Sequence, residues 1–203
     1  MTVREHVQGS DRLYWREMAS PIGTLTLLAS ERGLCSIDFG AFAEVACELA
    51  AWAKRWWREP VLVPAAEDHP LLGEARAQLE AYFRGELTRF TVPLDLRGTP
   101  FQCKVWDALC NVPYGATASY GDIAAVVGRP KASRAVGGAN NRNPVPIIVP
   151  CHRIIGADGS LVGYGSGLGI KEWLLALEGV KGSWGAALPA GQPAKRSAAA
   201  AGR

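Results

Sequence analysis

The apolar pattern changes its period partway along the chain, and this change limits the possible folds more than any other feature. Residues 13–19, 23–29 and 34–39 are strand-like, and turn sequences containing Gly23 and Gly33 separate them. From residue 42 onward, apolar residues recur at three- and four-residue steps, the period of one helical face. This order predicts an α+β chain that opens with a small antiparallel sheet.

The helical pattern first predicts helices over residues 42–57 and 71–84, with Gly85 ending the second. Tryptophans 52, 56 and 57 cluster at the end of the first helix, where we expect core packing rather than base stacking. A third helix is expected after Thr99, which can cap it, with Pro100 in its first turn.

Two short helices are expected next. Ser119 caps the first and Gly128 ends it, while Pro130 opens the second, over residues 131–140. Two short helices joined by a tight turn are typical of a helix-turn-helix, although this pattern is weak evidence alone. The second helix consists largely of small residues around Arg134, which permits close approach by a ligand or by a neighbouring helix.

Charge is divided unevenly along the chain. Residues 1–100 hold 11 Lys/Arg and 14 Asp/Glu, whereas residues 101–184 hold 8 Lys/Arg and 5 Asp/Glu. The stretch 123–157 has no carboxylate and carries Arg129, Lys131, Arg134, Arg142 and Arg153. The asymmetry fits an anionic partner for the second half, and it equally fits a solvated basic face.

Composition excludes several classes of protein. A chain of 203 residues with 48% hydrophobic residues can bury one or two cores. No apolar stretch approaches the ~20 residues of a membrane span, and the first residues lack a secretory pattern, so we expect a cytoplasmic protein. Five cysteines at irregular spacing are expected to be thiols, and without a Cys-x-x-Cys pair no metal site is expected.

An apolar segment, residues 143–155, carries the adjacent Cys151 and His152, and we expect a short buried strand that delivers them into a turn. Six glycines follow within residues 156–169, and a final helix is expected over residues 168–178. A thiol attacks as its thiolate, so a reactive Cys151 needs a base. Neighbouring side chains on a strand point apart, which favours a water bridge between Cys151 and His152. These residues alone leave a structural and a reactive role open.

A series of linked motifs between about residues 94 and 179 resembles the O6-alkylguanine-DNA alkyltransferase family. The motifs are Phe101-Gln-x-Lys-Val-Trp, Ser119-Tyr-Gly-Asp-Ile-Ala, Arg134-Ala-Val-Gly-Gly-Ala, Asn143-Pro-Val-Pro, Pro150-Cys-His-Arg, Gly163-Tyr and Lys171-Glu-Trp-Leu-Leu. The first ninety residues match loosely, through Ser20-Pro-Ile-Gly and Ala81-Tyr-Phe-x-Gly. The resemblance implies a ribonuclease H-like domain over residues 1–93, a mainly helical, winged-helix-like domain with a helix-turn-helix over 94–184, and a disordered basic tail over 185–203.

The resemblance also implies a reaction. Members of this family transfer an alkyl group from O6 of guanine in DNA, and we expect also from O4 of thymine, onto their own cysteine in a single irreversible step. Cys151 matches that acceptor. His152 would take its proton through a water and pass charge toward Glu178. The other matching residues are Asn143, which would fix the segment, Tyr120, which would donate to guanine N3, and a substrate pocket of Pro146, Ile154, Tyr164, Gly165 and Ser166. No cofactor and no metal are implied.

The implied partner is double-stranded DNA that contains O6-alkylguanine. In the family the second helix of the helix-turn-helix enters the minor groove, and an arginine, here Arg134, takes the place of the extruded nucleotide. Close approach is expected at Ala132, Ser133, Ala135 and Gly137, and phosphate contacts are expected at Arg129, Lys131 and Arg142. We expect a monomer, and cooperative binding along DNA stays open.

Three other functions fit the sequence less well. Lesion-binding relatives without chemistry replace the acceptor cysteine, usually by tryptophan, whereas Cys151 is present here. A transcriptional regulator would need a further domain with a cysteine cluster. A cysteine hydrolase would need a histidine far from Cys151 in sequence, and the other two are His6 and His69.

Overall fold

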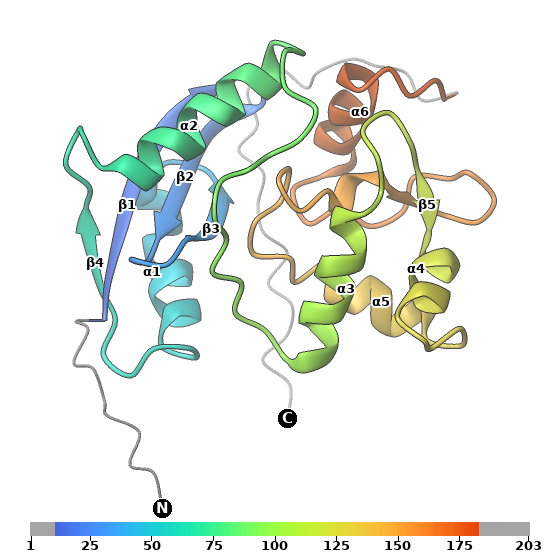
Figure 1. Cartoon of the computed structure of the whole chain (residues 1–203), viewed down its shortest axis with the longest axis horizontal. Helices are drawn as coiled ribbons and strands as arrows, with labels where there is room; N and C mark the ends of the chain where they lie inside the picture. The colour runs from blue at the N-terminus through green and yellow to red at the C-terminus, as the bar shows by residue number, and fades with distance from the viewer. Residues whose placement is uncertain (1–10, 183–203) are drawn as a thin grey trace, which may run out of the picture.

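The computed structural model describes residues 11–182, and Figure 1 shows a sheet with two helices beside a mainly helical part. The three predicted strands are confirmed as an antiparallel meander of β1 (Arg12–Ser20), β2 (Gly23–Ala29) and β3 (Leu34–Phe39). A fourth strand, β4 (Val61–Pro64), pairs in parallel with β1 and gives the order β3-β2-β1-β4. The sequence did not reveal β4, because it is a four-residue edge strand that ends in proline.

The two helices of the N-terminal half, α1 (Phe42–Ala53) and α2 (Pro70–Phe83), lie where helices were expected. The prediction for α1 was wrong at its end, because the chain turns after Ala53 while the apolar spacing continues. The N–H groups of Trp56 and Trp57 both donate to the carbonyl of Ala53, at 2.9 and 3.0 Å. Trp52 and Trp57 pack against a small core between α1 and the sheet, which confirms core packing for these two.

Helix α3 (Pro100–Cys110) begins as predicted. Thr99 Oγ1 accepts from the N–H of Gln102 at 3.3 Å, while the Gln102 side chain accepts from the N–H of Thr99 at 2.8 Å. The buried Trp106 donates its Nε1 to the carbonyl of Ala139 at 2.9 Å. This bond attaches α3 to the helix that carries Arg134.

The helix-turn-helix consists of α4 (Tyr120–Val126) and α5 (Ser133–Asn140). Ser119 caps α4 by accepting from the N–H of Asp122 at 3.1 Å, as predicted. Helix α5 begins two residues later than predicted, because the N–H of Ala132 donates to the carbonyl of Arg129 at 2.8 Å and closes a turn. Both α3 and α4 pack against α5.

The segment before Cys151 is buried as expected, but the prediction of a strand was wrong. Prolines 144, 146 and 150 remove donors that a strand needs, and Ile147 adopts a left-handed φ of 77°. Cys151–Arg153 forms a single 3-10 turn, η1, followed by β6 (Ile154–Ile155), which pairs in parallel with β5 (Ala118–Ser119). The last helix, α6 (Leu168–Leu177), ends just before Glu178.

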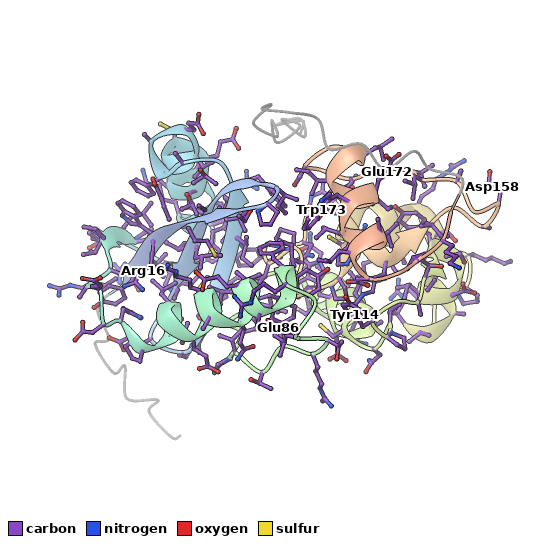
Figure 2. The ribbon with its side chains drawn as sticks, turned by 90° about the horizontal axis from the view of Figure 1, so that it is seen from above. Arg16, Glu86, Tyr114, Asp158, Glu172 and Trp173 are labelled. Carbon is purple, nitrogen blue, oxygen red and sulfur yellow. The ribbon has the colours of Figure 1, made fainter. Side chains whose placement is uncertain are left out.

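The N-terminal half (residues 11–93) and the C-terminal half (residues 94–182) share one hydrophobic core, to which α2, α3, α6 and the sheet all contribute. Figure 2 shows Trp173 of α6 between the halves, where its ring lies 6.0 Å from that of Phe83. The N–H of Ile37 on β3 donates to the carbonyl of Pro144 at 2.9 Å, so the sheet edge supports the segment that leads to Cys151.

No helix among residues 11–182 is long and apolar enough to cross a membrane. The domain boundary at residues 93 and 94 stays a prediction. The expected tail, residues 185–203, lies outside the described residues.

Candidate active site

Cys151 begins the 3-10 turn η1 and is buried, with 4% of its surface exposed. Asn143 holds the irregular segment before it: its Nδ2 donates to the carbonyl of Val149 at 2.8 Å, and its Oδ1 accepts from the N–H of Val145 at 3.0 Å. The Asn143 side chain also hydrogen-bonds Cys151 in a way that favours the thiolate. The bend at the prolines is thus fixed by one amide.

His152 is fully buried and its two ring nitrogens have different surroundings. Nε2 lies 2.8 Å from Oε1 of Glu178, whereas Nδ1 has no hydrogen-bond partner within residues 11–182. An ionised carboxylate accepts, so Nε2 carries the proton and Nδ1 presents its lone pair. The imidazole is therefore arranged as a base whose free side is Nδ1.

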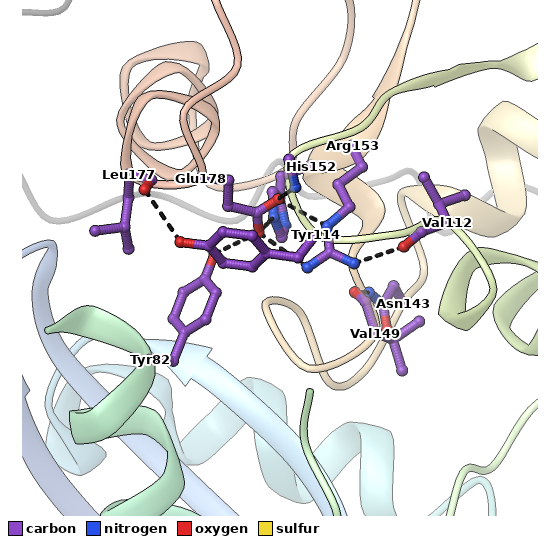
Figure 3. Close-up of polar contacts among 10 residues, drawn as sticks. Tyr82, Val112, Tyr114, Asn143, Val149, His152, Arg153, Leu177 and Glu178 are labelled. Atoms are coloured by element: carbon purple, nitrogen blue, oxygen red, sulfur yellow. Dashed lines mark hydrogen bonds and ion pairs between the residues drawn. The ribbon is translucent and has the colours of Figure 1, made fainter. Parts of the chain in front are cut away.

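Glu178 receives hydrogen bonds at both oxygens, from both halves of the chain (Figure 3). Oε1 accepts from Tyr82 Oη at 2.7 Å and from an Arg153 terminal nitrogen at 3.0 Å, besides His152. Oε2 accepts from Arg153 Nε at 2.9 Å and from the N–H of Gly115 at 3.2 Å. Burial alone would raise the pKa of Glu178, but the bonds from His152 and Arg153 lower it to about 2. Glu178 is a fixed carboxylate at neutral pH.

Arg153 is buried, whereas its position in a basic stretch of the sequence indicates an exposed side chain. Although it belongs to the basic stretch 123–157, its side chain is buried, and it also donates to the carbonyl of Val112 at 2.6 Å. Its charge neutralises Glu178 and does not add to an exposed basic face.

The sequence motifs do not predict a site role for Lys171, yet its side chain is fully buried, with Nζ bonded to the carbonyl of Ile154 just beyond η1. Its Nζ donates to the carbonyl of Ile154 and, at 3.0 Å, to that of Val162. The spacing contains a signal for this burial, because Lys171 stands one residue after Ile170 and three before Leu174 on the apolar face of α6.

Burial shifts the pKa values of the Cys151 thiol and of two groups near it, His152 and Lys171. It raises the pKa of Cys151 to about 11, against the opposing effects of Asn143 and the Lys171 charge. It lowers the pKa of His152 and lowers that of Lys171 to about 8. At neutral pH the site therefore contains a thiol, a neutral imidazole and a buried ammonium.

Two tyrosines lie near the thiol. Tyr120 Oη donates to the carbonyl of Val162 at 3.1 Å, in the glycine-rich loop. Tyr164 Oη is buried without a hydrogen-bond partner in the described structure. Burial, and secondly the negative charge of a Cys151 thiolate, raise the pKa of Tyr164 well above its ordinary value. Of the other residues expected in the pocket, Pro146 and Ile154 are buried, Ser166 is half-buried and Gly165 is exposed.

The residues expected at DNA lie around α5. Arg129, Lys131, Arg134, Ala135 and Arg142 are exposed, while Ala132, Ser133 and Gly137 are half-buried. A Cβ on Gly137 would meet only the Tyr120 ring, at 3.7 and 3.8 Å, which is ordinary contact. The fold itself does not require glycine at this position.

Residues 11–182 contain no group of three or more His, Cys, Asp or Glu side chains placed to hold a metal ion. The expected absence of a cofactor stays an expectation.

Two family models match the chain: the ribonuclease-like domain of 6-O-methylguanine DNA methyltransferase over residues 13–96, and the DNA-binding domain of the same protein over residues 100–180. A methylated-DNA--protein-cysteine methyltransferase of Methanosarcina acetivorans is 49% identical over 169 residues, which cover 82% of this chain and 99% of the relative. The crystal structure of Mycobacterium tuberculosis O6-methylguanine methyltransferase is 46% identical, with a TM-score of 0.68 over 82% of this chain and 92% of that one. A structure of Mycobacterium tuberculosis OGT in complex with DNA is 45% identical, with a TM-score of 0.66 over 81% and 92% of the two chains.

Proposed function

The chain belongs to the 6-O-methylguanine DNA methyltransferase family, and we propose that Cys151 is the residue that accepts the alkyl group. One observation carries this assignment: the buried Cys151 is followed by a histidine whose Nε2 is held by Glu178 while Nδ1 stays free. A nucleophile, a base and a group that orients the base are the parts that covalent transfer needs.

In the proposed reaction, the Cys151 proton passes through a water to His152 Nδ1, and Glu178 stabilises the imidazolium that forms. The sulfur then forms the S–C bond as the bond from the alkyl carbon to O6 breaks. The electron pair leaves with guanine, which takes up a proton, so a thioether and ordinary guanine are the products. Nothing in this site breaks the thioether, so each molecule reacts once.

The departing guanine needs a hydrogen-bond donor, and we assign that role to Tyr120. Its hydroxyl is already near the loop of the pocket, where it donates to Val162. The pocket would be formed by Pro146, Ile154, Tyr164, Gly165 and Ser166, with the N–H of Gly165 meeting O6. O4 of thymine presents an alkoxy group of the same kind, and we propose it as a second substrate.

The proposed partner is double-stranded DNA, bound by a monomer through α5. Stacked guanine hides O6 from Cys151, so the nucleotide must be extruded at a cost of a few kcal/mol. Arg134 is exposed and can occupy the vacated space, while the small residues Ala132, Ser133, Ala135 and Gly137 allow the backbone to approach the groove. Arg129, Lys131 and Arg142 would contact phosphates, which makes binding sensitive to salt.

We also propose a cytoplasmic location. All five cysteines are free thiols, and Cys47 and Cys110 are exposed. Exposed free thiols persist in a reducing compartment.

The first prediction tests the acceptor. Incubation with a duplex containing O6-methylguanine is expected to add one methyl group to the protein, located on Cys151 by peptide mass spectrometry. Cys110→Ala, which removes an exposed thiol, should react like the wild type, whereas Cys151→Ala should not react. An unmodified wild-type mass with the lesion still in the DNA would refute the proposed function.

A further inference from the structure

One side chain of the N-terminal half reaches the carboxylate of the relay. Tyr82 lies at the end of α2, is fully buried, and donates its hydroxyl to Glu178 Oε1 at 2.7 Å. That oxygen is the one that faces His152 Nε2. Figure 3 shows the Tyr82 ring rising from α2 toward this carboxylate. Among the described residues, Tyr82 supplies the hydrogen bond that Glu178 receives from outside the C-terminal half.

The position of this hydroxyl is fixed by aromatic packing. The Tyr82 ring lies 5.6 Å from that of Phe83, 5.3 Å from that of Phe90 and 6.1 Å, edge to face, from that of Tyr114. Burial and the charge of Glu178 raise the pKa of Tyr82 far above its ordinary value. The hydroxyl therefore keeps its proton at neutral pH and donates it to Glu178.

We infer that Tyr82 is a positioning residue for alkyl transfer: its hydroxyl aims Glu178 Oε1 at His152 and withdraws negative charge from that oxygen. The inference rests on the proposed roles of His152 and Glu178. A carboxylate oxygen that accepts several donors attracts each proton less strongly. Tyr82 thus keeps His152 neutral, with Nδ1 able to accept the proton of Cys151.

Other groups also act on His152. Glu178 is the anion, Arg153 and Lys171 are cations that disfavour a charged imidazole, and Cys151 and Tyr164 are neutral at neutral pH. Arg153, the residue that follows His152 in the chain, donates to both oxygens of Glu178. Tyr82 differs from all of these because it belongs to α2, so the inference gives the N-terminal half a direct part in the chemistry.

The test compares Tyr82→Phe with Tyr114→Phe. Tyr114 is the matched control, because its hydroxyl donates to the carbonyl of Leu177 at 3.1 Å and does not contact the carboxylate. Transfer from free O6-benzylguanine is measured across pH, so DNA binding does not enter. Losing the Tyr82 donor should slow transfer about tenfold at neutral pH, the effect expected for one hydrogen bond to a charged group.

The dependence of the transfer rate on pH separates the two roles of Tyr82. A purely structural role would lower the rate without moving the pH at which the rate falls on the acid side. Without the Tyr82 bond, Oε1 attracts the imidazole proton more strongly, so the pKa of His152 rises and the acid limb of the profile moves to higher pH. Tyr114→Phe should leave the limb in place. In a Glu178→Gln background, Tyr82→Phe should have no further effect, since it acts through the carboxylate.

An unshifted acid limb in Tyr82→Phe, or a uniform loss of rate at all pH values, would overturn the inference. Thermal unfolding checks that the variant is folded at the assay temperature. If it is not, 3-fluorotyrosine at position 82 replaces it: the stronger donor should move the limb to lower pH, and no movement overturns the inference. A wild type that transfers nothing at any pH refutes the proposed function instead.

Discussion

At the scale of single residues, Lys171 is the side chain with the least expected place. It is a fully buried cation whose Nζ donates to two backbone carbonyls, and within residues 11–182 it has no carboxylate partner of the kind that usually accompanies a buried charge. The nearby group that can supply a negative charge is Cys151, once it loses its proton. The ammonium therefore favours the form of Cys151 that attacks.

The corresponding variant is Lys171→Met, which keeps the length of the side chain and removes its charge. We expect the pKa of Cys151 to rise further and alkylation at neutral pH to slow about tenfold, the effect of one pKa unit. Rates of reaction with O6-benzylguanine across pH measure both effects, and the rise of rate with pH should move to higher pH. Lys181→Met, at an exposed lysine beyond α6, is the control. A profile that matches the wild type would show that the charge does not act on the thiol.

The resemblance to a family predicted Cys151, His152 and Glu178 as site residues, and the structure brings His152 Nε2 within 2.8 Å of Glu178 Oε1. The sequence could not place Arg153, because a charge count treats every arginine in a basic stretch alike, and only the fold shows that this one is enclosed with Glu178. Tyr82 was visible as part of a motif, but its contact joins residues 96 positions apart.

At the scale of elements, helix α5 of the helix-turn-helix exposes its one long side chain, Arg134. Arg134 is exposed while Val136 and Ala139 on the same helix are buried, so one face packs inward and the other is open to solvent. Because a Cβ at residue 137 would meet only ordinary contacts, packing within the fold does not explain this glycine, which is consistent with the proposed close approach to DNA.

Arg134→Ala should therefore slow repair of a duplex much more than reaction with free O6-benzylguanine. Only the duplex substrate requires a side chain to fill the space of an extruded nucleotide. Because extrusion costs a few kcal/mol, we expect the rate with DNA to fall at least about tenfold. Single-turnover rates with the two substrates give the comparison. Arg76→Ala, at an exposed arginine on α2, is the control. Equal losses on both substrates would exclude Arg134 from extrusion.

The starts of α3 and α4 could be predicted because their caps are local, whereas α5, whose N-cap residue Ala132 makes no side-chain cap bond, begins later than predicted. Thr99 and Ser119 accept from N–H groups three residues later, and these spacings are visible in the sequence. The strand β4 could not be predicted, since it depends on pairing with the distant β1. The segment before Cys151 carries a local warning in its three prolines, but its path also depends on a distant element. Ile37 of β3, for example, holds the carbonyl of Pro144.

At the scale of the whole molecule, Glu178 connects the two halves, and this connection depends on its charge. The pKa of Glu178 lies near 2, below its ordinary value of 4.5, so the carboxylate form stabilises the fold. The sign follows from linkage: this contribution is fully present above about pH 4.5 and is lost as the pH falls toward 2.

Glu178→Gln should accordingly destabilise the protein at neutral pH by about 3 kcal/mol, an order of magnitude taken from the pKa shift. The difference from the wild type should shrink as the pH falls below about 4.5, where the wild type takes up the proton. Urea unfolding at a series of pH values measures it. A difference that stays constant with pH would mean that the charge of Glu178 contributes nothing to stability.

The position of α6 in the chain has a consequence for biosynthesis. Lys171 and Glu178 belong to the last described helix and its end, so they leave the ribosome after the sheet, α2 and the helix-turn-helix. Domains fold as units during synthesis, the N-terminal one first. Tyr82 is thus synthesised before the carboxylate it contacts, and Cys151 and His152 are synthesised before Lys171 and Glu178, the cation and the carboxylate that act on them. A nascent chain therefore carries an unactivated thiol until Glu178 has been made.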